Sequence, residues 1–227
     1  MTFKEVFTAY YTAYRAESEV PDSTDDEYIT GMRFANEAVN YWSNYENTYW
    51  KELFKTLVGA DDGDKLIVTG KTTYECPSDM REVGGFVKIL NSDAVAVRNI
   101  PIVEPQDVQF MSASSQFCYF TGDPTTGFIL NINLVPGTSI NGGQINYVYY
   151  KKPNLFTTDT DTSEVPNGYF IVNRMLANRF RVSRNPYYNS ALRDAENDIR
   201  TMQADNNSGS WANPWKVSDR SGTIWGA

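Results

Sequence analysis

The pattern of hydrophobic and polar residues predicts helices at both ends of the chain and strands between them. The first helix is expected to begin at Thr2, because Thr2 and Glu5 have the spacing of a capping box. Apolar and aromatic side chains then recur every three or four residues, as they do on one face of a helix. The predicted buried stripe is Phe3, Val6, Phe7, Tyr10 and Tyr14.

That pattern ends in the polar run ESEVPDSTDDE, after which a second helix is predicted. Ser23 or Thr24 is the expected N-cap, and acidic residues at 25–27 occupy the first turn, where the helix dipole favours negative charge. After an interruption at 44–47, the helical pattern continues until the glycines at 59–63. The buried stripe is predicted as Tyr28, Met32, Ala35, Val39 and Trp42, continued by Trp50, Leu53, Phe54 and Leu57.

The middle of the chain has short apolar runs separated by Gly, Pro, Asn and Asp, which is typical of strands joined by turns. Around Leu130 the apolar side chains alternate with polar ones, so one face of that strand is expected to be buried. Pro105–Met111 is predicted to be a short helical turn. The predicted strands are Lys65–Val68, Phe86–Leu90, Ala94–Arg98, Gln116–Phe120, Gly127–Leu134 and Gln144–Lys151.

Two further helices are predicted after the strands. Ser163 or Asn167 is the expected cap of the first of them, with Pro166 near its first turn, and Asn185-Pro186 ends it. Its predicted stripe is Tyr169, Val172, Leu176 and Phe180, and that of the last helix is Leu192, Ala195, Ile199 and Met202.

This order of elements predicts an α+β protein, because helices and strands are kept in separate runs. We expect a four-helix bundle of two N-terminal and two C-terminal helices, an inserted antiparallel β domain and an extended C-terminal tail. The expected division is 1–60 for the first half of the bundle, 61–152 for the β insertion, 153–204 for the second half of the bundle and 205–227 for the tail.

Composition narrows the possible functions. A formal net charge of −8 argues against a protein that grips nucleic acid through phosphates, which needs clustered Lys and Arg. The chain has no His, so Ser-His-Asp and Cys-His catalysis and His-ligated zinc are excluded. Aromatic residues make up 14% of the chain, more than a disordered protein would carry, and they belong either to a large core or to interfaces.

Candidate chemical sites each have a simpler structural interpretation. Cys76 and Cys118 have no paired spacing and are expected to be small buried residues. Asp61–Asp64 resembles part of a calcium loop, but the position that needs Glu is Thr72, so a turn is preferred. Asp159, Asp161 and Glu164 could act as glycosidase carboxylates, although a solvated loop with helix caps is preferred. No cofactor, metal site or enzymatic activity is predicted.

Two groups of residues are candidates for binding a partner. A basic cluster follows the β region, and we favour a charged subunit interface for it over contact with DNA, the default being a solvated face with salt bridges. The polar C-terminal tail carries tryptophans that either pack back on the body or anchor it on a neighbouring subunit or portal, and we favour the second. The candidates are Arg174, Arg179, Arg181, Arg184, Trp211, Trp215 and Trp225.

The region that joins the last predicted strand to the third helix reads INYVYYKKPNLFTTDTDTSEVPNGYFIVNRMLANRF. Its aromatic strand, Lys-Pro, Thr/Asp loop and Pro-marked helix resemble the adaptor, or head-to-tail connector, proteins of tailed bacteriophages, of the tail tubular protein A type. The resemblance covers most of residues 1–204 and depends on the order and spacing of its pieces. Supporting pieces are FANEAVNYW, YWKELF, YECPSDMREVGGFVKI, IPIVEPQDVQFM and CYFTGDPTTGFILNINLVP.

The resemblance implies a structural virion protein without catalytic residues. Such proteins form a ring, expected here to be dodecameric, below the portal, where the ring extends the DNA channel and docks the tail. The implied partners are further copies of the chain, the portal protein and tail or nozzle proteins, with genomic DNA passing through the lumen without specific binding. The implied location is the virion neck, after assembly in the host cytoplasm.

Two alternatives remain open at the level of the sequence. The strands, exposed tryptophans and carboxylates are compatible with a carbohydrate-binding or carboxylate-based glycan-acting virion protein. A stopper or tail-completion protein of the same neck is the second alternative. No apolar stretch has the roughly 20 residues that a membrane helix needs, and the N-terminal residues lack the pattern of a secretory signal, so no membrane partner is expected.

Overall fold

The computed structural model describes residues 1–15, 19–58, 66–112, 114–123, 125–133 and 135–208. These residues fall into two units, each described by itself below. The helical unit contains Met1–Leu53 and the described residues from Pro153 onward, and the β unit contains Phe54–Lys152. Helices and antiparallel sheets are therefore segregated, and the predicted α+β class is confirmed.

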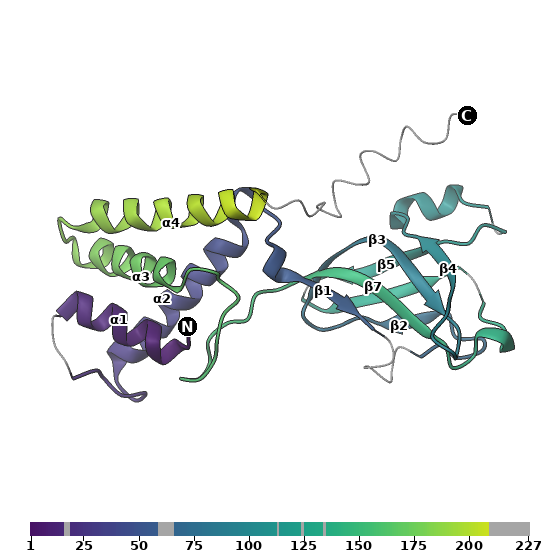
Figure 1. Cartoon of the computed structure of the whole chain (residues 1–227), viewed down its shortest axis with the longest axis horizontal. Coiled ribbons are helices and arrows are strands. Elements are labelled where there is room, and N and C mark those ends of the chain that lie inside the picture. The colour runs from purple at the N-terminus through teal and green to yellow at the C-terminus, as the bar shows by residue number, and fades with distance from the viewer. Residues whose placement is uncertain (16–18, 59–65, 113, 124, 134, 209–227) are drawn as a thin grey trace. The chain divides into compact units, whose positions relative to one another are not determined.

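The helical unit is built from α-helices that come from both ends of the chain (Figure 1). Helix α3 contacts each of the other helices, so it lies at the centre of the unit. Short 3-10 helices η1 and η2 follow α2. The bounds are α1 Phe3–Arg15, α2 Asp26–Ser43, η1 Tyr45–Asn47, η2 Lys51–Leu53, α3 Gly168–Ser183 and α4 Tyr188–Ser208.

The start of α1 follows the sequence prediction. The Thr2 N–H donates to Glu5 Oε2 at 2.8 Å, and the Glu5 N–H donates to Thr2 Oγ1 at 3.3 Å, which is the reciprocal pattern of a capping box. The predicted stripe is buried except for Tyr14, which is half-buried. Its aromatic rings pack with Tyr28 and Phe156, so the core of this unit is largely aromatic.

The predicted cap of α2 is wrong. Asp25 occupies the N-cap position, without a side-chain capping bond. Thr24 is engaged in the preceding turn, where both its N–H and its hydroxyl donate to Asp22 Oδ1 at 2.8 and 2.6 Å. Because the Thr24 side chain is bonded within this turn, it does not cap the helix.

The helical pattern predicted for residues 50–57 is also wrong in its second half. Phe54–Leu57 forms strand β1, paired antiparallel with Tyr147–Tyr150 of strand β7. Trp50 is buried in the helical unit, where its Nε1 donates to the Trp42 carbonyl at 2.8 Å. The chain thus changes from helix to strand within a few residues. The apolar residues of this segment are divided between the core of the helical unit and the core of the β unit.

The β unit, whose strands are labelled in Figure 1, has two antiparallel sheets, with strand orders β1-β7-β3-β4 and β2-β6-β5. The short helix η4 is the helical turn predicted at 105–111, and η5 precedes β7. The bounds are β1 Phe54–Leu57, β2 Thr73–Glu75, β3 Met80–Leu90, β4 Ala96–Pro101, η4 Pro105–Phe110, β5 Cys118–Asp123, β6 Gly127–Ile132, η5 Thr138–Ile140 and β7 Gln144–Lys151.

Most strand predictions agree with the structure, with two differences. The segment predicted as strand 65–68 contributes only one bridge, between Leu66 and Gln144. Strands β1 and β2 were not predicted as strands. The core side of β6 follows the predicted alternation, with Leu130 and Ile132 buried. Cys118 is buried in this core, where burial raises its pKa to about 12, Cys76 is half-buried, and no disulfide joins them.

The predicted stripe of α3 is rotated relative to the buried face. Tyr169 is 63% exposed, whereas Phe170, Ile171 and Met175 are buried. Asn167 is the N-cap, as one of the two predicted alternatives, and its side chain accepts from the Tyr169 N–H. The stripe of α4 agrees with the prediction, with Leu192 half-buried. Because α4 runs to Ser208, residues 205–208 are helical and do not belong to the tail to which they were assigned.

Candidate functional site

The predicted partner-binding residues have different positions in the structure. Trp211, Trp215 and Trp225 lie outside the described residues. The four arginines lie on or just after α3, but only two of them are exposed. The basic cluster that the sequence suggested is therefore two pairs of residues with different environments.

Arg174 connects three helices of the helical unit. Its Nη1 lies 3.6 Å from Glu196 Oε1 on α4, and its guanidinium lies 4.0 Å from the centre of the Tyr41 ring on α2. The Tyr41 hydroxyl donates to the same Glu196 oxygen at 2.9 Å. Burial, followed by the bond to Glu196, raises the pKa of Tyr41. Arg174 is therefore a packing residue of the unit rather than part of a solvated surface.

Arg179 has a similar role on the other side of α3. Its Nη2 lies 2.9 Å from Glu27 Oε1, and the same oxygen accepts from Arg15 Nη2 at 2.9 Å. Both guanidinium groups also lie near the Tyr14 ring, 4.8 Å from its centre for Arg179 and 5.1 Å for Arg15. The arrangement joins α1, α2 and α3 through one carboxylate.

Arg181 and Arg184 are exposed, and within the described part of the chain neither has an ion pair. Val182, between them, is 64% exposed, and Tyr187, in the turn before α4, is 68% exposed. We call Arg181, Val182, Arg184 and Tyr187 the α3–α4 corner. Exposed Tyr and Arg side chains are typical of interface cores. The charge pattern of the sequence indicated the arginines but gave no sign of Val182 and Tyr187.

The α3–α4 corner has a well-defined backbone. Arg184 is the C-cap of α3 in the left-handed conformation, with φ 52°, and the Asn185 N–H donates to the Phe180 carbonyl at 2.9 Å. The Asn185 side chain accepts from the Tyr187 N–H at 2.9 Å. The Tyr187 ring lies 6.4 Å from the ring of Phe180, centre to centre. These hydrogen bonds fix the backbone of the turn that carries the exposed ring, which lowers the entropy cost of burying the turn against a partner.

A cavity of about 700 Å³ lies between the first turns of α2 and the loop residues 157–159. Its apolar part comes from Tyr28, Ile29 and Met32, and Ile29 is 57% exposed. Its polar wall comes from the exposed loop residues 157–159. We call this hollow the α2 cavity, and its complete lining is Ser23, Tyr28, Ile29, Met32, Arg33, Asn36, Thr157, Thr158 and Asp159.

In the loop 157–164, which we call the acidic loop, side-chain carboxylates hold the loop itself, and backbone carbonyls hold the start of α1. Asp161 accepts hydrogen bonds from the N–H and hydroxyl groups of both Thr157 and Thr158 at 2.6–2.8 Å. These bonds, led by that of the Thr157 hydroxyl, lower the pKa of Asp161. The backbone carbonyls of Asp161 and Asp159 accept from the first N–H groups of α1, those of Phe3 and Lys4, at 2.9 and 3.1 Å.

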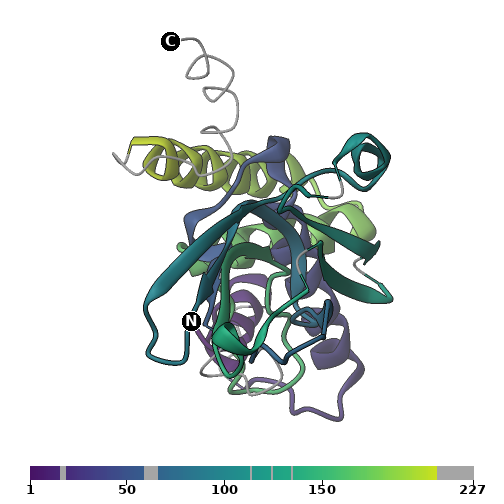
Figure 2. The same ribbon diagram turned by 90° about the vertical axis from the view of Figure 1, so that its right-hand side faces the viewer.

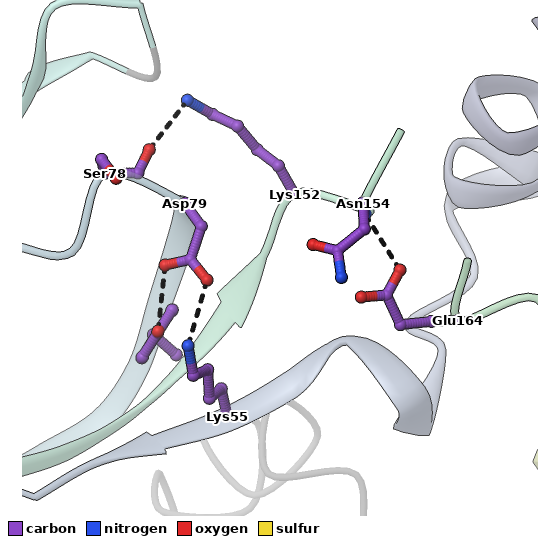
Figure 3. Close-up of polar contacts among 7 residues, drawn as sticks. Lys55, Ser78, Asp79, Lys152, Asn154 and Glu164 are labelled. Atoms are coloured by element: carbon purple, nitrogen blue, oxygen red, sulfur yellow. Dashed lines mark hydrogen bonds and ion pairs between the residues drawn. The ribbon is translucent and has the colours of Figure 1, made fainter. Parts of the chain in front are cut away.

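The remaining carboxylates of this loop also have structural partners. The Asp159 carboxylate accepts from the Tyr28 hydroxyl, and Glu164 Oε2 accepts from the Asn154 N–H at 2.9 Å (Figure 3). The arrangement matches the preferred interpretation of a capped, hydrogen-bonded loop. Ser163, the other predicted cap of α3, is half-buried but is not the capping residue.

In the β unit, charged side chains bind at the ends of strands. Lys55 on β1 and the Tyr149 hydroxyl on β7 both bind the Asp79 carboxylate, at 3.3 and 3.0 Å (Figure 3). Burial raises the pKa of Tyr149 to about 12. Lys152 Nζ donates to the Ser78 carbonyl at 3.3 Å. These contacts fasten the first and last strands of the unit to the segment before β3.

The β unit also exposes apolar side chains. Strand β4 lies at an edge of its sheet, and Val95 beside it and Val97 within it are exposed. Phe110 at the end of η4 is 79% exposed, and η4 stands at the periphery of the unit (Figure 2). A small cavity of about 260 Å³ lies where the pairing of β3 with β7 shifts between Gly84 and Lys88. These are exposed apolar features of the described part of the β unit.

Metal and membrane sites can be assessed only for the described residues. Among them, no group of three or more Cys, Asp or Glu side chains is placed to hold a metal ion. Asp61–Asp64, the weak calcium candidate, lies outside the described residues. No helix of the described chain is long and apolar enough to cross a membrane.

Comparison with models of known protein families places the chain in a family. The model of a family described as "SU10 adaptor protein" matches residues 1–218. No curated protein matches the chain. The matched range includes every helix and strand of both units.

Proposed function

We propose, from the premise that this chain belongs to the SU10 adaptor protein family, that it forms a ring below the portal of a tailed phage. Membership makes the chain a structural protein of the phage head-to-tail adaptor class, located at the virion neck. The single observation that carries the proposal is the family match over residues 1–218. The finer assignment to the tail tubular protein A type is part of the proposal.

In this proposal the four helices act as one bundle, and the ring is dodecameric. Each copy contacts its two neighbours through heterologous surfaces that close around the axis. The ring extends the DNA channel from the portal and offers a docking surface to tail or nozzle proteins. The exposed Tyr, Phe and Arg side chains of both units support the proposal that each copy contacts other proteins, because such residues are enriched at protein interfaces.

The acidic character of the chain suits a channel for DNA. The formal net charge is −8, so the protein does not supply the excess of cations that would bind the phosphate backbone by releasing counterions. Genomic DNA then passes through the lumen without specific binding. An excess of basic residues on the lumen wall of an assembled ring would contradict this part of the proposal.

The C-terminal segment after Ser208 is proposed to bind the portal. Its sequence carries Trp211, Trp215 and Trp225 among polar residues, and large aromatic side chains are frequent anchors at interfaces. Assembly in the host cytoplasm, before the tail is attached, completes the proposal. The segment could instead contact a neighbouring copy, and the two outcomes are separated by the experiment below.

Electron microscopy of the protein mixed with the portal protein of the same phage tests the proposal. We expect a ring of adaptor copies stacked on the portal, with density for the C-terminal segment on the portal surface. A monomer that does not bind the portal protein but binds sugars on a glycan array would instead support a carbohydrate-binding virion protein. A single level of copies that plugs the channel would support a stopper or tail-completion protein.

A further inference from the structure

We propose that the α3–α4 corner of one copy inserts into the α2 cavity of a neighbouring copy. This inference rests on the proposed function, because it names the surfaces through which adjacent copies of the ring would bind. Both surfaces belong to the helical unit and use different residues, so every copy carries one corner and one cavity. Copies joined in this way form a heterologous, head-to-tail contact, which is the kind that can close into a ring.

The shapes and polarity of the two surfaces are complementary. The corner presents an exposed aromatic ring, Tyr187, and an exposed aliphatic side chain, Val182. The cavity of about 700 Å³ is large enough for an aromatic side chain and has an apolar part made by Tyr28, Ile29 and Met32. Because Ile29 and Tyr187 are both more than half exposed, their mutual burial removes apolar surface from water on both sides.

The charges are complementary as well. The run Arg181–Tyr188 contains two arginines and no carboxylate. The cavity is lined by Asp159, and exposed Asp22, Asp25 and Asp26 adjoin its lining at the start of α2. The only cation of the lining, Arg33, lies 3.9 Å from Glu37, one turn further along the helix. The arginines of the corner would then face the carboxylates around the cavity when Tyr187 enters it. This attraction favours the orientation in which the corner of one copy meets the cavity of the next.

The corner of a copy does not line the cavity of the same copy. In Figure 1 the turn between α3 and α4 lies at the upper left of the helical unit, while α2 begins at its lower edge. The end of α3 is fixed to the start of α2 by the Arg179–Glu27 pair, and α3 is fixed to α4 by the Arg174–Glu196 pair. Because these pairs fix the corner and the cavity within each copy, the occupant assigned to the cavity is the corner of a second copy.

Disulfide trapping of the full-length chain tests the inference. One variant carries Tyr187→Cys and the other Ile29→Cys, with an affinity tag on one so that mixed dimers are identified by mass. Both positions are exposed, so neither change is expected to disturb folding. The unchanged chain is run beside them, because Cys76 is half-buried and sets the background of cross-linking.

We expect the mixture of the two variants to form disulfide-linked heterodimers at least about tenfold more than either variant alone, which corresponds to about 1.4 kcal/mol of preferential association. The matched control mixes Tyr187→Cys with Asn197→Cys, an exposed position on α4 away from the cavity lining. A chain with both Tyr187→Cys and Ile29→Cys should give a ladder of multimers. Adding Arg181→Glu and Arg184→Glu, or raising the salt concentration, should lower the yield.

Heterodimer yields no higher than those of the control mixture would overturn the inference. Stronger linkage of either variant with itself would also overturn it, because it indicates a symmetric contact. Binding of the reduced variants to portal separates this failure from failure of the proposed function. Variants that bind portal but do not cross-link refute only the named surfaces, whereas a chain that neither binds portal nor self-associates refutes both.

Discussion

The side-chain amide of Asn36 pairs with both backbone groups of Phe156. Asn36 Nδ2 donates to the Phe156 carbonyl at 2.9 Å, and the Phe156 N–H donates to Asn36 Oδ1 at 2.8 Å. The two residues are 120 positions apart, on α2 and on the segment that enters the acidic loop. Phe156 lies outside any helix or strand, so its backbone groups have no regular partner, and the Asn36 side chain supplies one for each of them. Only 1% of the surface of Phe156 is exposed.

Replacing Asn36 by Leu should destabilise the helical unit. The substitution preserves approximate size but leaves a buried N–H and a buried carbonyl without partners, which costs about 2 kcal/mol. Chemical denaturation with two spectroscopic probes, one for helix content and one for tryptophan environment, measures the loss. Asn197→Leu, at an exposed position of α4, is the control and should change stability by less than about 0.5 kcal/mol. Equal stability of both variants would show that the Asn36 pair is not needed.

The place at which the C-terminus is truncated should decide whether the chain stays stable. Asn206 on α4 is 8% exposed, accepts from the Lys51 N–H and donates to the Tyr49 carbonyl, both at 3.0 Å. Removing residues 206–227 deletes these bonds and should lower the unfolding free energy by about 2 kcal/mol. Removing 209–227 keeps Asn206 and should leave stability unchanged.

Measuring portal binding of the shorter truncation distinguishes an effect on docking from an effect on stability. The chain without residues 209–227 should melt like the full chain but lose binding to portal, because it lacks Trp211, Trp215 and Trp225. Calorimetry and a portal pull-down measure the two properties on the same sample. Undiminished portal binding of this truncated chain would refute the role proposed for the tryptophans.

Arg179 and Arg181 should respond differently to the same substitution. Arg179→Met removes a charged partner of Glu27 and a group that lies over the Tyr14 ring, and should cost about 2 kcal/mol. Arg181→Met changes an exposed side chain and should alter stability by less than about 0.5 kcal/mol. Arg181→Met is expected instead to weaken the association between copies that we propose for the α3–α4 corner. Thermal unfolding and sedimentation distinguish the two effects.

Acidification should expose the role of Asp161. Its pKa is lowered in the folded protein, so the unfolded chain binds the proton more readily, at a pKa of about 3.9. Its contribution to stability is therefore complete above that unfolded pKa and is lost as the pH falls toward the folded pKa. Asp161→Asn should reduce stability at neutral pH and flatten the loss of stability below about pH 4.

Denaturation curves collected from pH 7 downward provide the measurement for Asp161. Asp194→Asn is the matched control, since it removes an exposed carboxyl of α4 that lacks the four hydrogen-bond donors around Asp161. An acid profile of Asp161→Asn that is superimposable on that of the unchanged chain would count against this role of the loop. Loss of acid sensitivity in both variants would point to a general charge effect.

Several predictions from the sequence agree with the structure because their signals are local. The capping box of Thr2 and Glu5, the cap at Asn167 and the turn at Pro105 depend on residues a few positions apart. Prediction failed where distant residues decide the outcome. Phe54 and Leu57 continue a helical spacing, but pairing with Tyr150 and Tyr147 makes them a strand. Tyr169 fits a stripe that the packing of α3 leaves in solvent.

The candidate site shows the same division. Charge in the sequence identified Arg174, Arg179, Arg181 and Arg184 as one group, since nothing local distinguishes them. Arg174 and Arg179 pair with Glu196 and Glu27, which belong to other helices. The tertiary positions of these carboxylates therefore distinguish the partly buried arginines from the exposed ones. Tyr187 was missed because its exposure follows from the course of the α3–α4 turn.

The sequence by itself determined the α+β class, the position of most helices and strands, and the resemblance to phage adaptors, because periodicity, caps and turn residues act over a few neighbours. The tertiary structure alone decided where the helical unit ends, which arginines face solvent, and that the acidic loop caps α1 through the carbonyls of Asp159 and Asp161. The physical reason is that burial and hydrogen-bond partners depend on residues brought together from both ends of the chain.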